Sequence, residues 1–240
     1  MTDRKPGGNN SQLSLELPKE GKPQQLVLEL PIREALDRED FFISSSNEKA
    51  VQMIDLWPDW PHHVLVLVGP SGSGKSHLAK VWQGASGAEI ISAKDFTEKR
   101  LQELGVSNGL IVEDVDKGRI DETILFHLFN VVKENGLNLL LTARSMPGDW
   151  DIKLPDLRSR WRSIPVVTID PPDDTLLKAT LVKHFADRQL DVSPEVINFI
   201  ALNIDRAMSV ARQSVDAIDS YALATGHRIT RRLAKKVLGV

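Results

Sequence analysis

The chain has 240 residues, no cysteine and a formal net charge of −3, and 41% of its residues are hydrophobic. The absence of cysteine excludes disulfide scaffolds, zinc held by cysteine, cysteine nucleophiles and iron–sulfur clusters. The near-neutral charge gives no overall excess of positive charge for binding nucleic acid. No apolar run of about 18 residues is present for a membrane span. Because the N-terminus also lacks the apolar core of a secretory signal, we expect a cytoplasmic protein with no membrane contact.

Residues 1–34 are predicted to form a flexible tail, since glycine, asparagine and proline interrupt its apolar stretches. It contains two near copies of a Q-L-x-L-E-L-P peptide, at 12–18 and 25–31. The alternating leucines suit an extended strand that joins the core, and the second copy lies close to the folded part. They also suit a short motif that docks in the apolar groove of a partner, which the isolated first copy favours.

The following segment alternates between apolar strands and helices. Predicted strands occupy residues 64–68, 89–91, 110–112, 137–141 and 166–169. Predicted helices occupy residues 76–83, 96–104 and 123–135. This β-α order predicts a parallel sheet with helices on both faces. We therefore place an α/β nucleotide-binding domain over residues 35–170.

After Pro171-Pro172 the strand patterns stop and helical patterns take over. The four predicted helices span residues 174–188, 194–203, 206–224 and 230–238. We expect them to form a small all-helical lid domain over residues 171–240. Its end is basic and holds Arg228, Arg231, Arg232, Lys235 and Lys236. We interpret these charges as the solvated face of a helix rather than as a DNA contact.

A phosphate-binding motif follows the first buried strand. The residues G-P-S-G-S-G-K-S match G-x-x-x-x-G-K-[ST], with an apolar strand before them and a helix after them. The glycines let backbone N–H groups curl around a phosphate, and the helix N-terminus adds its positive end. Lys75 is expected to reach the β- and γ-phosphates, and Ser76 to ligate Mg²⁺. With the residue after the motif, the expected nucleotide-binding set is Gly69, Pro70, Ser71, Gly72, Ser73, Gly74, Lys75, Ser76 and His77.

Acidic residues follow the strand at 110–112, where a phosphate loop needs them. Glu113 is expected to join Ser76 in holding Mg²⁺, and Asp114 to orient an attacking water. Thr142, at the end of an adjacent strand, is expected to sense the γ-phosphate with its hydroxyl. The alternatives are that the acids cap the next loop and that Thr142 merely ends its strand. The expected lining of the adenine pocket is Phe42, Ile43 and Pro70.

In this order the motifs resemble those of AAA+ proteins, and more narrowly those of the DnaA-type replication initiators and their shortened Hda subfamily. The resemblance covers about residues 25–240. It implies that Arg160, in the sequence L-R-S-R, is an arginine finger for a neighbouring subunit's nucleotide, with Arg158 as the alternative register. It implies that Arg206 contacts the nucleotide of its own subunit. The alternatives are a surface arginine beside Asp156 and an ordinary arginine at a helix start.

The resemblance also gives the tail peptides a partner. Hda-like proteins bind the DNA polymerase sliding clamp (the beta subunit) through a Q-L-[SP]-L-x-L peptide. Both copies match it, the first with Ser14 and the second with Val27 in the third place. The expected clamp-binding residues are Gln12, Leu13, Leu15, Leu17, Gln25, Leu26, Leu28 and Leu30.

The function implied by the resemblance is regulatory. A protein holding ADP or ATP with Mg²⁺, tethered to the clamp, promotes hydrolysis of ATP on a DnaA-type initiator and so prevents re-initiation. The family usually has Asp where Glu113 stands, and Asp114 is shorter than the usual Glu, so weak hydrolysis of its own is expected. Since the sequence ends with the lid, we expect it to reach DNA only through the clamp; a homodimer is a further expectation. The alternatives are a free-standing ATPase, such as a helicase loader, and a P-loop kinase of a small metabolite.

Overall fold

The structure is a computed structural model that describes residues 42–104, 109–117 and 120–240. The predicted flexible tail and both leucine peptides lie outside the described residues, so the clamp-binding assignments stay predictions. In the described part, none of the helices is long and apolar enough to cross a membrane.

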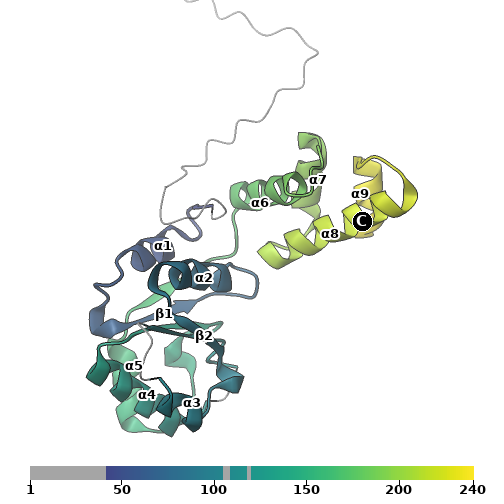
Figure 1. Cartoon of the computed structure of the whole chain (residues 1–240). Coiled ribbons are helices and arrows are strands. Elements are labelled where there is room, and N and C mark those ends of the chain that lie inside the picture. The colour runs from purple at the N-terminus through teal and green to yellow at the C-terminus, as the bar shows by residue number, and fades with distance from the viewer. Residues whose placement is uncertain (1–41, 105–108, 118–119) are drawn as a thin grey trace, which may run out of the picture.

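Five parallel strands form the central sheet of the described chain, in the order β2-β3-β4-β1-β5 (Figure 1). The strands are β1 (Val64–Val68), β2 (Glu89–Ser92), β3 (Gly109–Glu113), β4 (Asn138–Ala143) and β5 (Val166–Thr168). The central strand β1 is buried along its whole length, which explains its continuous apolar sequence. The predicted parallel sheet is confirmed.

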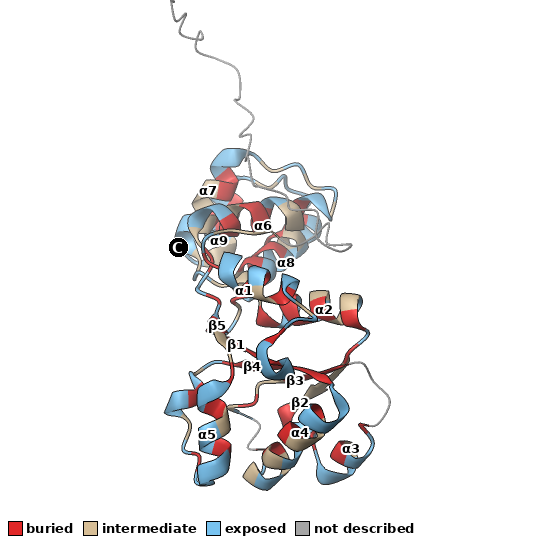
Figure 2. Ribbon diagram, turned by 90° about the vertical axis from the view of Figure 1, so that its left-hand side faces the viewer, coloured by how far each residue is buried: buried red, intermediate tan, exposed pale blue. Residues whose placement is uncertain are grey.

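Helices cover both faces of the sheet (Figure 2), and the side chains of β1 alternate between two apolar clusters, one on each face. Its three valines pack toward α3 (Glu98–Gln102), α4 (Glu122–Asn135) and α5 (Pro155–Ser163). Its two leucines pack toward α1 (Glu48–Asp55) and α2 (Lys75–Ser86). Because every loop after a strand leaves from the same edge of a parallel sheet, this arrangement gathers the loops after β1, β3 and β4.

Four further helices form a helical region with its own apolar cluster. They are α6 (Asp174–Ala186), α7 (Pro194–Asn203), α8 (Met208–Thr225) and α9 (Arg231–Leu238). Leu181, Phe185 and Ile218 are completely or almost completely buried in this cluster. β5 ends at Thr168 and α6 begins at Asp174, and the domain boundaries predicted at 34 and 170 stay predictions.

The structure differs from the expected elements at the ends of several elements and in two additional helices. The helix expected at 96–104 is the shorter α3, because Thr97 caps it by accepting a hydrogen bond from the Arg100 N–H at 3.4 Å. Helices α1 and α5 were not predicted. In α5 only Leu157 and Trp161 are buried, so its sequence is mostly polar, and packing on α4 rather than an apolar pattern stabilises it.

Candidate nucleotide-binding site

The phosphate loop runs from the end of β1 into α2, as the motif predicts, and each of its glycines has a close neighbour or a backbone angle that disfavours a side chain. Gly72 and Gly74 have φ angles of 75° and 103°, in the region that favours glycine. A Cβ on Gly69 would lie 2.4 Å from the backbone oxygen of Ile169. The backbone can therefore form a tight concave loop with its N–H groups available to an anion.

Two buried polar groups in this loop fit a bound phosphate. The Lys75 ammonium donates to the backbone oxygens of Gly69 at 2.7 Å and Pro70 at 2.9 Å, which leaves one of its three donors for a ligand. Burial lowers the pKa of Lys75, while the carboxylate of Asp114 acts in the opposite direction. The Ser73 hydroxyl is buried without a hydrogen-bond partner among the described residues. Buried polar groups normally have partners, so Ser73 is free to bind a ligand oxygen.

The predicted acids and Thr142 meet at the same edge of the sheet, because β3 and β4 are neighbours in register. The Asp114 N–H donates to the Thr142 hydroxyl at 3.0 Å, which leaves the hydroxyl hydrogen as a donor. Asp114 has a φ of 57°, which turns the chain sharply after β3. One carboxylate oxygen of Glu113 is buried without a partner among the described residues.

Asp116 is a connecting residue to which the sequence patterns assigned no role. One of its carboxylate oxygens accepts hydrogen bonds from the Arg144 N–H at 2.9 Å, and from the Ser145 N–H and hydroxyl, each at 3.0 Å. The Arg144 side chain lies 3.8 Å from the Asp114 carboxylate. These contacts join the loop after β3 to the loop after β4 and fix Thr142 beside Asp114. An acid three residues beyond the end of a strand gives no recognisable signal in sequence.

A magnesium ion at this site would take most of its ligands from the nucleotide and from water. Within the described ranges no group of three or more His, Asp or Glu side chains could hold a metal. Ser76 is exposed and Glu113 is half-buried, and these two expected ligands are of the oxygen type that Mg²⁺ takes. Mg²⁺ commonly binds through one or two protein ligands with phosphates and waters supplying the rest, so the residues fit such an ion.

The helical region contacts the phosphate loop directly. The Met208 N–H, at the start of α8, donates to the Gly72 oxygen at 2.8 Å. A Cβ on Gly72 would lie 2.6 Å from the Ser209 hydroxyl oxygen. Beside this contact lies a pocket of about 300 Å³ lined by Phe42, Asn47, Ser73, Gly74, His77, Leu176, Thr180, Lys183, His184, Met208 and Arg212. The pocket joins the loop to the helices and is the place where a base or ribose would fit.

This pocket contains some expected residues and some that the sequence did not suggest. Phe42 and His77 line it, whereas Ile43 packs on the apolar layer under α1. Lys183, His184 and Arg212 had no expected role, because single polar residues on amphipathic helices give no distinctive pattern. Burial, and secondarily the charge of nearby Arg188, lower the pKa of His184.

Arg206 lies close to the contact between α8 and the phosphate loop, but its side chain is paired with another residue. Its guanidinium pairs with the carboxylate of Asp174 at 2.7 Å, and both side chains are more than half exposed. Arg206 is two residues before Met208, whose N–H binds Gly72. The expected contact between Arg206 and a nucleotide stays a prediction.

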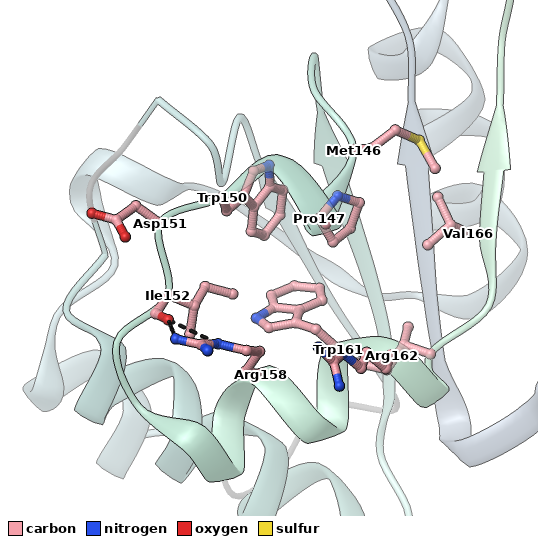
Figure 3. Close-up of a pocket in the computed structure, with 11 residues that line it drawn as sticks. Met146, Pro147, Trp150, Asp151, Ile152, Arg158, Trp161, Arg162 and Val166 are labelled. Atoms are coloured by element: carbon pink, nitrogen blue, oxygen red, sulfur yellow. Dashed lines mark hydrogen bonds between the residues drawn. The ribbon is translucent and has the colours of Figure 1, made fainter.

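The arginines of α5 have different surroundings. The Arg160 guanidinium lies over the ring of Phe126, a residue of α4, at 4.6 Å from the ring centroid. Arg158 donates to the backbone oxygen of Ile152 at 3.2 and 2.5 Å (Figure 3). Arg162 lines a pocket of about 450 Å³ beside Trp161. Because Arg158 is bonded to the Ile152 backbone, Arg160 is the better candidate of the two for the predicted arginine finger.

Glu122 positions the start of α5, a role that no motif indicated. Its two carboxylate oxygens accept from the Lys153 N–H at 2.9 and 3.0 Å and from the Leu154 N–H at 2.8 Å. These backbone bonds hold the pKa of Glu122 below its usual range. The link fixes the chain directly before Pro155, where α5 begins.

The strand order, the phosphate loop between β1 and α2 and the helical region after β5 define the AAA+ fold. Two solved structures share it. Domain III of the Thermotoga maritima replication initiation protein DnaA matches with a TM-score of 0.70 at 21% identity, covering 87% of this chain and 98% of that one. A replication initiator DnaA bound to AMPPCP and single-stranded DNA matches with a TM-score of 0.64 at 18% identity, covering 78% of this chain and 67% of that one. No protein-family model matches the chain.

Sequence comparison points to the same proteins. The chromosomal replication initiator DnaA of Campylobacter jejuni is 25% identical over 197 residues, which is 74% of this chain. The match spans 45% of that initiator, so the chain corresponds to about half of such a relative. An uncharacterized protein of Haemophilus influenzae is 26% identical over 184 residues, covering 72% of this chain and 80% of that protein. The chain is therefore a homologue of DnaA with the AAA+ fold.

Proposed function

We propose that the chain binds an adenine nucleotide, ADP or ATP with Mg²⁺, between the phosphate loop and helices α6 and α8. The buried Ser73 hydroxyl, which has no hydrogen-bond partner in the described part of the chain, and the spare donor of Lys75 support a phosphate in the loop. Ser76 and Glu113 would hold the Mg²⁺, which supplies charge neutralisation at the phosphates. The AMPPCP bound to a DnaA of the same fold also supports an adenine nucleotide.

We further propose that the chain is a regulator tethered to the DNA polymerase sliding clamp, and that it promotes hydrolysis of ATP on a DnaA-type initiator and so prevents re-initiation. The main support for this proposal is the position of the Arg160 side chain. It lies half-exposed on α5, and in the described ranges no carboxylate pairs with it. Leaving the Phe126 ring costs about 0.5–1 kcal/mol, which is small beside the charge it would stabilise at a neighbour's phosphates.

The surroundings of Asp114 support weak hydrolysis by the chain alone. Its carboxylate lies 3.8 Å from the Arg144 guanidinium, so it already has an oppositely charged neighbour that competes with an attacking water. Its short side chain also starts from a backbone with φ of 57°. The site is therefore better suited to holding a nucleotide than to rapid turnover.

The test mixes the protein with ATP-loaded initiator, clamp and DNA, and follows phosphate release. Arg160→Ala should lose the stimulation, by an amount on the order of 10³-fold for an arginine finger. Arg162→Ala, two residues away on the same helix, is the matched control and should keep it. If Arg160→Ala stimulates as well as the parent, the finger assignment is wrong. Steady turnover without initiator, abolished by Lys75→Ala, would indicate a free-standing ATPase instead.

The clamp tether has a separate test, because the two leucine peptides lie in the tail. Gln12 and Leu13 are replaced by alanine in one variant, Gln25 and Leu26 in a second, and all four in a third. Capture of the protein on immobilised clamp should be lost in one of the first two variants and in the third. Undiminished capture of the third variant would rule out the tether while leaving the nucleotide site unaffected.

A further inference from the structure

The end of α8 and helix α9 lie on the side of the helical region away from the phosphate loop (Figure 1). A basic groove lies between them. It encloses about 440 Å³, and its lining includes Tyr221, His227 and three cations, Arg228, Arg232 and Lys236. No carboxylate is among its lining residues, and no acidic residue occurs from Gly226 to Val240. The positive charge is thus concentrated in a chain whose net charge is −3.

The groove cations are not neutralised within the described part of the molecule. None of the three has a salt-bridge partner there, whereas the neighbouring Arg231 lies 3.6 Å from Glu195. Arg232 and Lys236 are one turn apart on α9, so they follow each other at about 6 Å along the helix. Arg232 also lies in the first turn of α9, where the helix dipole disfavours a cation and favours an anion. A bound polyanion would relieve both kinds of repulsion.

We propose that this groove binds the phosphate backbone of duplex DNA. The Lys236 ammonium lies over the Tyr221 ring, 5.4 Å from its centroid, so that face is not open for stacking with an unpaired base. Duplex DNA presents phosphates on both strands, with one charge per about 1.7 Å of axis, and needs no stacking. This proposal differs from the expectation that DNA is reached only through the clamp, and from the interpretation of these charges as a solvated helix face.

The exposed surface of α9 argues against a membrane as the occupant. Membrane-surface helices place apolar side chains next to their cations. In α9 the exposed positions from 231 to 236 are all basic, whereas Leu233 and Ala234 are buried in the apolar cluster. An acidic protein also carries negative charge, so polyglutamate is included in the test as a competing ligand.

The test measures binding of the full chain to a dye-labelled mixed-sequence duplex by fluorescence anisotropy between 50 and 200 mM salt. Three phosphate contacts predict a slope of log K against log salt of about −2.7, or about 40-fold weaker binding across this range. The variant Arg228→Gln/Arg232→Gln/Lys236→Gln should bind at least about tenfold more weakly at 50 mM salt and lose most of this slope. Arg228→Lys/Arg232→Lys keeps the charge and should bind like the parent.

The matched control is Lys49→Gln/Lys94→Gln/Lys133→Gln, which removes the same charge from exposed positions elsewhere and should keep the binding. Equal loss in this control, or unchanged binding in the groove variant, overturns the proposal. Stronger groove-dependent binding to a single strand, to polyglutamate or to anionic vesicles also overturns it in favour of that occupant. The assay contains no clamp, initiator or nucleotide, so its outcome is independent of the proposed regulatory function.

Discussion

Replacing Gly72 by alanine should separate the helical region from the phosphate loop. The new Cβ would lie 2.6 Å from the Ser209 hydroxyl oxygen and 2.9 Å from the Ala207 Cβ, so α8 must move away. That movement breaks the hydrogen bond from the Met208 N–H to the Gly72 oxygen, worth about 1 kcal/mol. A φ of 75° adds about 1–2 kcal/mol for alanine, so the total loss is about 2–3 kcal/mol.

The conformational part of this loss has a matched control. Gly87→Ala, at a φ of 69° with no atom within 4 Å of the added Cβ, should cost only the backbone strain and lower Tm by about 2–8 °C. Gly72→Ala should lower Tm further and also weaken nucleotide binding by about tenfold, which corresponds to about 1.4 kcal/mol. Thermal unfolding and calorimetric titration with ADP measure the two effects.

Ser209→Ala in the Gly72→Ala background removes the nearest atom and should restore part of the lost affinity. The reasoning is refuted if Gly72→Ala and Gly87→Ala bind ADP with the same affinity. It is also refuted if the Ser209 change rescues nothing, because the loss would then come from the loop alone and not from α8.

Two further predictions concern titratable side chains. The pKa of His184 is lowered from its ordinary value of 6.5, so the unfolded chain binds more protons and stability should fall as pH drops below about 6.5; in His184→Gln, Tm should depend less on pH between 7 and 5. Glu122→Ala frees the Lys153 and Leu154 N–H groups, and should reduce stimulation of initiator hydrolysis without changing ADP affinity. Since the pKa of Glu122 is lowered, its stabilising effect is present above its ordinary pKa, and the Tm gap between parent and variant should close in acid.

The sheet could be predicted from the sequence, whereas helix α5 could not, for identifiable physical reasons. β1 is buried on both faces, so its apolar run is unambiguous and the motif after it fixes the loop. In α5 the burial of Leu157 and Trp161 depends on α4, which lies more than 20 residues earlier in the chain. Local sequence cannot report such long-range packing, and the bonds that Glu122 makes to the start of α5 are equally invisible to it.

In the candidate site, too, residues within one continuous motif could be predicted, whereas residues that make contacts distant in sequence could not. Gly69 to Ser76 form a continuous segment whose spacing carries the chemistry, so their place was predictable. Asp116 and Arg212 act through contacts across 28 or more residues, to the loop after β4 and to the pocket beside Gly74. Their roles depend on how the sheet edge and α8 are brought together, which no spacing in the sequence records.

The pairing of Arg206 with Asp174 explains how a nucleotide could move the helical region at little energetic cost. Both side chains are more than half exposed, and exposed ion pairs contribute only about 0–1 kcal/mol. Phosphate oxygens offer an arginine stronger, charge-assisted hydrogen bonds than a solvated carboxylate does. Because Met208 binds Gly72 two residues further on, a shift of Arg206 toward the loop would be transmitted directly to the start of α8. If Arg206 contacts the nucleotide as predicted, nucleotide binding and the position of the helical region would be coupled through this short segment.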